Sequence, residues 1–476
     1  MTTKQISQEE GQTQAPSGEQ LKGFVEESAA RLEVPGVAVG IHTSGEDLFA
    51  YHGVTSIENP LPVEEDTLFQ SGSTGKTFTA TAIMRLVEQG QIDLDAPVKT
   101  YVPELELKDS AVAEKVTVLH LLNHTAGWQG DLMDNTGDGD DALAKYVELM
   151  AGLDQVTPLG ATVSYNNASL SLAGRVIEKV TGKVFQHAMK ELIFEPLGQD
   201  HSFFSLSEIM TRRFVVGHSQ KPDGSIKVSR PWALPRGAAP AGGITTNIGD
   251  LITWAKFHLN GGRTTAGEQL LSKKLVDRMQ KPTADLGGSI LGDHVGISWW
   301  LTDIGGLRQV AHGGNTIGQN CTFLMFPERD FALAALTNSA PNGGQLSDEL
   351  VKWALSSFLG VSKPEPEAIS VADEDLAVYT GSFETIAVVA NISPKDGGLL
   401  IDITIKPEVL DQLRETSDDP IEKQPPIPIG LLAGDGDRYV VTEGPAKGMT
   451  GYFVRSSTGE VEGIHVGGRL ATRTST

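Results

Sequence analysis

The chain has 476 residues, of which 61 are acidic and 38 are basic, and its formal net charge is −23. This length exceeds what a single hydrophobic core organises, so two or three domains are expected. The composition, 39% hydrophobic and 21% charged, is that of a folded protein, and its negative charge argues against a duplex nucleic acid or an anionic membrane as partner.

Residues 1–16 are polar and contain glycine and proline, so we expect a disordered N-terminal tail. They lack the apolar segment of a signal peptide. Nowhere in the chain does an apolar run approach the ~20 residues of a membrane helix. We therefore expect a cytoplasmic protein that does not bind a membrane.

A helix and two strands are predicted next. Ser17 and Gln20 resemble a capping box at the start of an amphipathic pattern that Pro35 ends. Residues 37–41 and 48–54 have strand character, with a turn between them. A helix followed by an antiparallel hairpin indicates an α+β arrangement.

Residues 68–90 are the stretch around which the rest of the chain is best understood. Apolar residues recur at helical spacing after Ser73, and Gly90 ends the pattern. Ser73 then lies at a helix N-terminus, where free N–H groups favour negative charge, and Lys76 follows one turn later on the same face. An amine with a lowered pKa can take the proton of the serine hydroxyl, so this pair is suited to nucleophilic catalysis.

The same residues allow two other interpretations. Gly75-Lys76-Thr77 resembles the end of a nucleotide-binding P-loop, but Gln70 stands where the first glycine of that motif belongs. In the purely structural interpretation, Ser73 caps an ordinary amphipathic helix, and Lys76 is an exposed lysine on its surface. The Ser-x-x-Lys pattern alone does not decide between them.

Residues 90–235 are predicted to form a loop-rich, mostly helical subdomain inserted into a sheet. His120 and His124 are four residues apart, but no glutamate follows His120 and no third metal ligand is evident, so structural roles are expected. The acidic segment 131–141 lacks the final glutamate of an EF-hand and is expected to be a solvated loop. Because Cys321 is the only cysteine, no intrachain disulfide and no cysteine-based metal site can form.

The sheet is predicted to resume near residue 296, so that one domain spans residues 17–361. Residues 362–374 form a proline-rich, charged linker. From residue 375 to residue 476, short strands alternate with turns, which predicts a small all-β domain, a barrel.

The segment Tyr165-Asn166-Asn167 lies in a loop that enters a predicted helix. Tyr165 can accept or relay a proton, and Asn167 can bind a substrate carbonyl while it positions Lys76. An asparagine-rich turn that caps the following helix is the simpler interpretation of this segment taken alone.

A third segment, His312-Gly313-Gly314-Asn315, joins two predicted strands. Its glycines allow the backbone of a substrate to approach closely, and free N–H groups on this edge can complete an oxyanion hole. A hairpin turn with a surface histidine is the simpler interpretation.

Together, Ser73-Thr-Gly-Lys76, Tyr165-Asn-Asn167 and His312-Gly-Gly314 resemble, in order and separation, the motifs of the serine β-lactamase and penicillin-binding-protein superfamily. The similarity is to the branch of class C β-lactamases, D-alanyl-D-alanine carboxypeptidases, D-aminopeptidases and family VIII carboxylesterases, and it covers about residues 18–360. Surrounding segments are similar too, namely residues 121–127, 194–198, 240–243 and 326–329. The resemblance implies an α+β fold whose antiparallel sheet is flanked by helices. The C-terminal domain is similar to the lipocalin-like barrels of some D-aminopeptidase-like members.

The resemblance also implies a mechanism. Ser73 attacks a carbonyl carbon, and Lys76 and Tyr165 manage its proton, with the choice of base left open. The backbone N–H groups of Ser73 and Asn315 hold the oxyanion, and water or another acceptor releases the acyl group from the serine. No metal or organic cofactor is implied. The residues implied in substrate binding and the proton network are Asn167, His312, Gly313 and Gly314.

The expected substrate is a small acyl compound. His312 stands where class C β-lactamases have lysine, which resembles the carboxypeptidase and aminopeptidase members. An ordinary histidine pKa of about 6.5 would let its charge change in the physiological range and affect the binding of anionic substrates.

We expect a peptidase or amidase with esterase activity. A carboxylesterase, a β-lactamase and a catalytically silent penicillin-binding or sensor protein are the alternatives. Four tryptophans suit an apolar pocket for esters or simply pack in the core: Trp128, Trp232, Trp299 and Trp300.

Overall fold

The computed structural model describes residues 15–474 apart from residues 133, 222, 417–422, 424 and 435–436. Nearly all of the expected N-terminal tail, residues 1–16, therefore lies outside the described residues. Within the described part of the chain, no helix is long and apolar enough to cross a membrane.

A nine-stranded antiparallel sheet forms the centre of the larger domain. Its strands run in the order β2-β1-β13-β12-β10-β9-β8-β7, and β11 pairs with β12 beside this path. The α+β class predicted from the sequence is thus confirmed. The strands are β1 (Gly36–Thr43), β2 (Glu46–Gly53), β7 (Ala284–Ser289), β8 (Gly292–Val295), β9 (Trp300–Ile304), β10 (Leu307–Ala311), β11 (Gly314–Thr316), β12 (Gln319–Phe326) and β13 (Phe331–Thr337).

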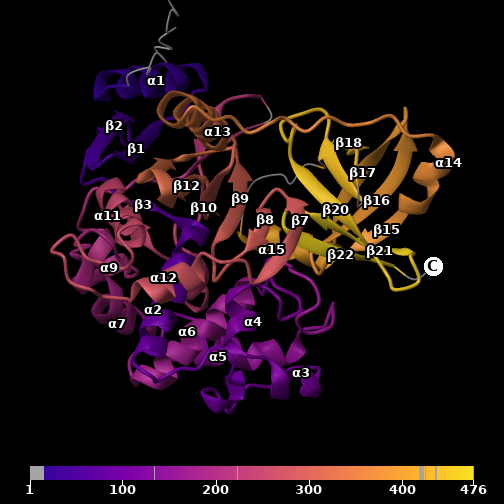
Figure 1. The fold of residues 1–476 in the computed structure, drawn as a ribbon, viewed down its shortest axis with the longest axis horizontal. Helices are drawn as coiled ribbons and strands as arrows, with labels where there is room; N and C mark the ends of the chain where they lie inside the picture. The colour runs from indigo at the N-terminus through magenta and orange to yellow at the C-terminus, as the bar shows by residue number, and fades with distance from the viewer. Residues whose placement is uncertain are drawn as a thin grey trace, which may run out of the picture.

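Helices cover both faces of this sheet, as Figure 1 shows. Alternate residues of β1 point to opposite faces. Val37, Val39 and Ile41 pack with the apolar faces of α1 (Gly18–Arg31) and α13 (Asn342–Ala354). On the other face, a Cβ at Gly40 would lie 2.6 Å from Ile252 of α11 (Ile248–Leu259), so glycine allows this helix to pack directly on the strand. The capping box of Ser17 and Gln20 at the start of α1 is confirmed.

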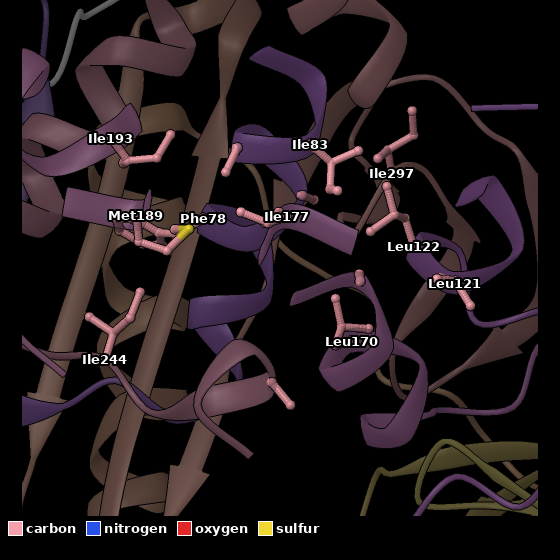
Figure 2. Packing of buried hydrophobic residues seen from close by; sticks show 14 of the residues in the cluster. Phe78, Ile83, Leu121, Leu122, Leu170, Ile177, Met189, Ile193, Ile244 and Ile297 are labelled. Carbon is pink, nitrogen blue, oxygen red and sulfur yellow. The ribbon is translucent and has the colours of Figure 1, made fainter. Parts of the chain in front are cut away.

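The second apolar core lies between the sheet and a group of helices, with α2 (Gly75–Glu88) at its centre. Eleven of the fourteen residues of α2 are buried, so the helix that follows Ser73 is fixed on nearly all sides. Figure 2 shows side chains of α2, α4 (Val118–Leu122), α6 (Asn167–Thr181) and α7 (Phe185–Met189) meeting in this core. Further helices that contribute to it are α3 (Ser110–Lys115), α5 (Ala142–Leu149), α8 (Glu195–Leu197), α10 (Ala239–Gly242) and α12 (Lys273–Met279), while α9 (Leu206–Ile209) packs in a separate small apolar cluster.

Short strands connect this helical region to the sheet domain. The pair β3 (Phe69–Gln70) and β6 (Thr245–Thr246) leads the chain into the turn that carries Ser73. A separate three-stranded sheet joins β14 (Ser339–Ala340), β4 (His218–Gln220) and β5 (Ile226–Val228).

The C-terminal domain is a closed antiparallel barrel of eight strands, β15 to β22, in sequence order. Apolar side chains that alternate along the strands fill its interior. The small all-β barrel expected from the sequence is thus confirmed. Its strands are β15 (Gly381–Glu384), β16 (Val388–Lys395), β17 (Gly398–Ile405), β18 (Ile427–Leu431), β19 (Arg438–Val441), β20 (Thr450–Arg455), β21 (Val461–Val466) and β22 (Arg469–Arg473), and its helices are α14 (Asp373–Leu376) and α15 (Pro407–Thr416).

The barrel packs against the β7 edge of the central sheet, where Figure 1 places β20 and β22. The backbone N–H of Ile290 donates to the carbonyl of Thr450 at 3.0 Å. A Cβ at Gly287 would lie 2.9 Å from the ring of Tyr452, so the two domains are in close contact here.

Candidate active site

Ser73 lies in a single 3-10 turn, residues Gly72–Thr74, directly before α2. The helix after Ser73 is confirmed, with this tighter turn at its start. Gly72 has a φ of +53°, and a Cβ there would lie 2.8 Å from the backbone nitrogen of Asn315. Glycine is therefore required twice at this position, by the backbone conformation and by the close approach of β11.

Lys76 is completely buried, one turn after Ser73. Its Nζ lies 3.1 Å from Ser73 Oγ and donates to the carbonyl of Ala241 at 2.6 Å. Burial lowers the pKa of Lys76 well below the ordinary 10.5; the positive charge of Arg469 lowers it further, and the negative charge of Asp131 opposes the shift. A lysine with a lowered pKa, in contact with a serine hydroxyl, is able to accept that proton.

Tyr165 lies next to Lys76, with the centre of its ring 4.8 Å from Nζ. Burial raises the pKa of Tyr165, while a hydrogen bond with the Ser73 side chain and the charge of Arg469 oppose the rise. The phenol is therefore protonated near neutrality, and it can donate or relay a proton to the Ser73 oxygen.

Asn166 and Asn167 have different partners. The side chain of Asn166 accepts from the N–H of Ser169 and caps α6, as the simpler interpretation of this segment predicts. The Nδ2 of Asn167 donates to Asp131 Oδ1 at 2.7 Å, so its hydrogen bond goes to an acidic side chain rather than to Lys76.

The third segment lies directly against the turn of Ser73. A Cβ at Gly314 would lie 2.0 Å from the carbonyl oxygen of Ser71 and 2.6 Å from the backbone nitrogen of Ser73. Only glycine fits there. The backbone nitrogens of Ser73 and Asn315, predicted as oxyanion donors, thus come from two adjoining segments.

His312 is buried, with 1% of its surface exposed, and is not the surface histidine of the simpler interpretation. Its Nδ1 donates to the carbonyl of Gly313 at 2.7 Å, and its Nε2 has no hydrogen-bond partner within the described chain. Burial lowers the pKa of His312 to about 3, and Lys76 contributes to this shift when its amine is protonated. The expectation that its charge changes near neutrality is therefore wrong.

Residues 21–355 match the family model described as Beta-lactamase. This chain belongs to the β-lactamase family. Penicillin-binding protein 4 of Amycolatopsis lactamdurans is 31% identical over 356 residues, which are 74% of this chain and 93% of that protein. A beta-lactamase of Yersinia enterocolitica is 29% identical over 245 residues, 51% of this chain and 60% of that protein. Among solved structures, SurE has a TM-score of 0.77 at 25% identity over 96% of this chain and 99% of SurE, and it has also been solved with D-Leu.

Other side chains of this β-lactamase-family site were not assigned to it from the sequence. His124, expected to be structural, is buried; its Nδ1 accepts from the backbone N–H of Asn166, and its ring stacks 4.9 Å from that of Tyr165 and 5.3 Å from that of Trp300. Asp131 and Arg469 complete the surroundings of Tyr165. Because Asp131 and Arg469 are 338 residues apart, no local pattern in the sequence could have identified them as neighbours in this site.

Of the four tryptophans considered for a pocket, only Trp300 lies in the ring cluster with Tyr165 and His312. Trp128 and Trp299 are buried in the core. Trp232 lines a different cavity of about 1000 Å³, which extends to Gly242 behind the turn of Ser73.

Since His312 stays neutral, we expect the profile of kcat/KM against pH to show no step near pH 6.5 that depends on this residue. Its replacement by glutamine is expected to lower kcat/KM on a p-nitrophenyl ester without changing the shape of the pH profile between pH 5 and pH 8. The measurement is kcat/KM against pH for both proteins. A step near neutrality that vanishes in the H312Q protein would show that His312 titrates there.

Proposed function

We propose that this protein is a serine hydrolase that works through an acyl-serine intermediate on the amide, peptide or ester bonds of small substrates. The observation that carries the proposal is the contact between Ser73 Oγ and the buried amine of Lys76, 3.1 Å away. A buried amine with a lowered pKa, next to a hydroxyl at a helix N-terminus, is the arrangement that activates a serine nucleophile.

In the acylation step, the neutral amine of Lys76 takes the proton of Ser73 Oγ while the oxygen attacks the carbonyl carbon. The pKa directions favour Lys76 as the base, since Tyr165 would have to lose a proton at a raised pKa. Tyr165 is placed to pass the proton on to the leaving group. The backbone N–H groups of Ser73 and Asn315 stabilise the negative oxygen of the tetrahedral intermediate.

In the second step, water or an amine attacks the acyl-serine. Its proton passes to the Lys76–Tyr165 pair and from there back to Ser73 Oγ, so the enzyme returns to its starting protonation state. The identity of the attacking group, water or amine, decides between hydrolysis and acyl transfer.

For the substrate, we propose an amide or ester of a D-amino acid or a short peptide with such a residue. Two observations support this choice. A neutral histidine stands at the third motif instead of a lysine, as in the peptidase members of the family. SurE, which shares both domains with this chain, was solved with D-Leu.

The test is a panel of p-nitrophenyl esters, matched D- and L-leucine p-nitroanilides and nitrocefin, combined with fluorophosphonate labelling of Ser73. We expect hydrolysis of the esters and of the D-leucine amide, and slower hydrolysis of the L-leucine amide. Faster turnover of nitrocefin than of any amide would make the protein a β-lactamase. Labelling of Ser73 without turnover of any compound would make it a penicillin-binding or sensor protein.

A further inference from the structure

The barrel holds the loop of Tyr165 with one hairpin, formed by β21 and β22. Gly467 and Gly468, with φ of +56° and +84°, make its two-residue turn. The carbonyl of Gly468 accepts from the backbone N–H of Tyr165 at 2.8 Å. The N–H of Leu470 donates to Ser164 Oγ at 3.2 Å. The Nε2 of His465 donates to the carbonyl of Val163 at 3.2 Å, so three successive residues of the loop are bound to the hairpin.

The first residue of β22, Arg469, extends this contact to the catalytic side chains. Its guanidinium lies over the ring of Tyr165, 4.9 Å from the ring centre. Its Nε and Nη2 donate to the two carboxylate oxygens of Asp131, the second at 3.1 Å. The same Asp131 Oδ1 accepts from Asn167, so Arg469, Asp131 and Asn167 form one chain of hydrogen bonds. A two-pronged arginine–carboxylate contact fixes both partners in direction as well as distance.

We propose that the β21–β22 hairpin is part of the catalytic site, and that Arg469 is a positioning residue that holds Tyr165 and, through Asp131, Asn167. This inference rests on the proposed acyl-serine function, and it extends the catalytic site beyond the β-lactamase-family segment into the C-terminal barrel. The barrel is thereby required for the rate of acylation.

The charges around Lys76 make this role measurable. Its other neighbours with titratable groups are Tyr165, His124 and His312, all neutral near pH 7 because of burial. Arg469 and Asp131 are the charged groups that act on its pKa, and they act in opposite directions. Removing Arg469 should therefore raise the pKa of Lys76 and move acylation to higher pH. Removing Asp131 should lower that pKa and move acylation to lower pH.

The barrel contains a matched control pair. Arg455 donates with Nε and Nη2 to Asp437 at 2.8 and 2.7 Å, and its guanidinium lies 5.5 Å from the ring centre of Tyr379. This is the same arginine–aspartate–tyrosine arrangement, formed entirely within the C-terminal domain. Loss of the Arg455 contact should lower the free energy of unfolding of the barrel by a similar amount and leave the geometry of the catalytic site unchanged.

The experiment measures the rate of fluorophosphonate labelling of Ser73 against pH in the full-length protein. The variants are R469M, R469K, D131N, the double variant R469M/D131N, and R455M as the control. In R469M the rising limb of the profile should move to higher pH by about one unit or more, because a positive charge is lost and Asp131 is left unpaired. In D131N the limb should move to lower pH, and in the double variant it should return close to that of the wild type.

R469K keeps the charge but loses the two-pronged contact. It should slow labelling at the plateau by about tenfold or more with little shift of the limb, because Tyr165 and Asn167 are less well held. R455M should match the wild type in both respects. If R469M does not fold, R469K and D131N carry the same test.

The inference would be overturned if the wild type is labelled at Ser73 and R469M, R469K and D131N show the same labelling rates and pH profiles as the wild type. It would also be overturned if R455M changed the labelling as much as the Arg469 variants do. Failure of the proposed function looks different. The wild-type protein itself would then not be labelled at Ser73.

Discussion

Replacement of Ser73 by alanine is expected to abolish the covalent adduct with a fluorophosphonate probe and to lower turnover of a p-nitrophenyl ester by a factor on the order of 10⁶. The oxygen that this change removes is the one in contact with Lys76 and Tyr165. Stability should change by only about 1 kcal/mol, since a single hydrogen-bonding group is lost and Lys76 keeps its bond to Ala241. Intact-mass spectrometry detects the adduct, and urea unfolding measures the stability.

Ser71 provides a matched control in the same turn. Its hydroxyl is buried and donates to the carbonyl of Ile244 at 3.1 Å, so its loss costs a comparable hydrogen bond. The S71A protein should still form the adduct. An adduct of unchanged yield in S73A would assign the nucleophile to another residue and remove the acyl-serine proposal.

Features encoded locally were predictable from the sequence. The spacing of Ser73 and Lys76 puts them on one helix face, and the structure brings their side chains into contact. The Ser17 capping box and the strand character of residues 37–41, which lie in β1, follow from short-range rules in the same way. These features depend on residues at most a few positions apart, so no knowledge of the fold was needed.

Features that depend on distant segments were not predictable. His312 was expected to titrate near neutrality because its pKa was taken as the ordinary histidine value of about 6.5. In the fold, however, Trp300 and Tyr165 pack beside it and exclude water. Arg469 and Asp131 are 338 residues apart, and neither belongs to a motif. Their meeting depends on how the barrel docks, which no pattern in the sequence specifies.

The replacement of Lys76 by methionine or arginine is expected to slow acylation by a factor on the order of 10²–10⁴, the usual contribution of a general base. Methionine has no basic nitrogen, and an arginine guanidinium stays protonated at all working pH values. The rate of fluorophosphonate labelling at its pH plateau is the measurement. Near-normal labelling of the K76R protein would exclude Lys76 as the proton acceptor.

Stability gives an independent measure of the pKa of Lys76. Burial lowers this pKa in the folded protein, so between the lowered value and the ordinary 10.5 the unfolded chain binds one more proton than the native chain. The free energy of unfolding of the wild type should therefore rise with pH across that window, at up to about 1.4 kcal/mol per pH unit, and the K76M protein should lack this contribution. The comparison uses urea unfolding of both proteins at several pH values up to 10.

The K22M protein is the control, because the Lys22 side chain is 62% exposed and its loss should leave the slope unchanged. Parallel stability curves for wild type and K76M would mean that Lys76 is protonated in the fold. A base other than the lysine would then have to take the serine proton.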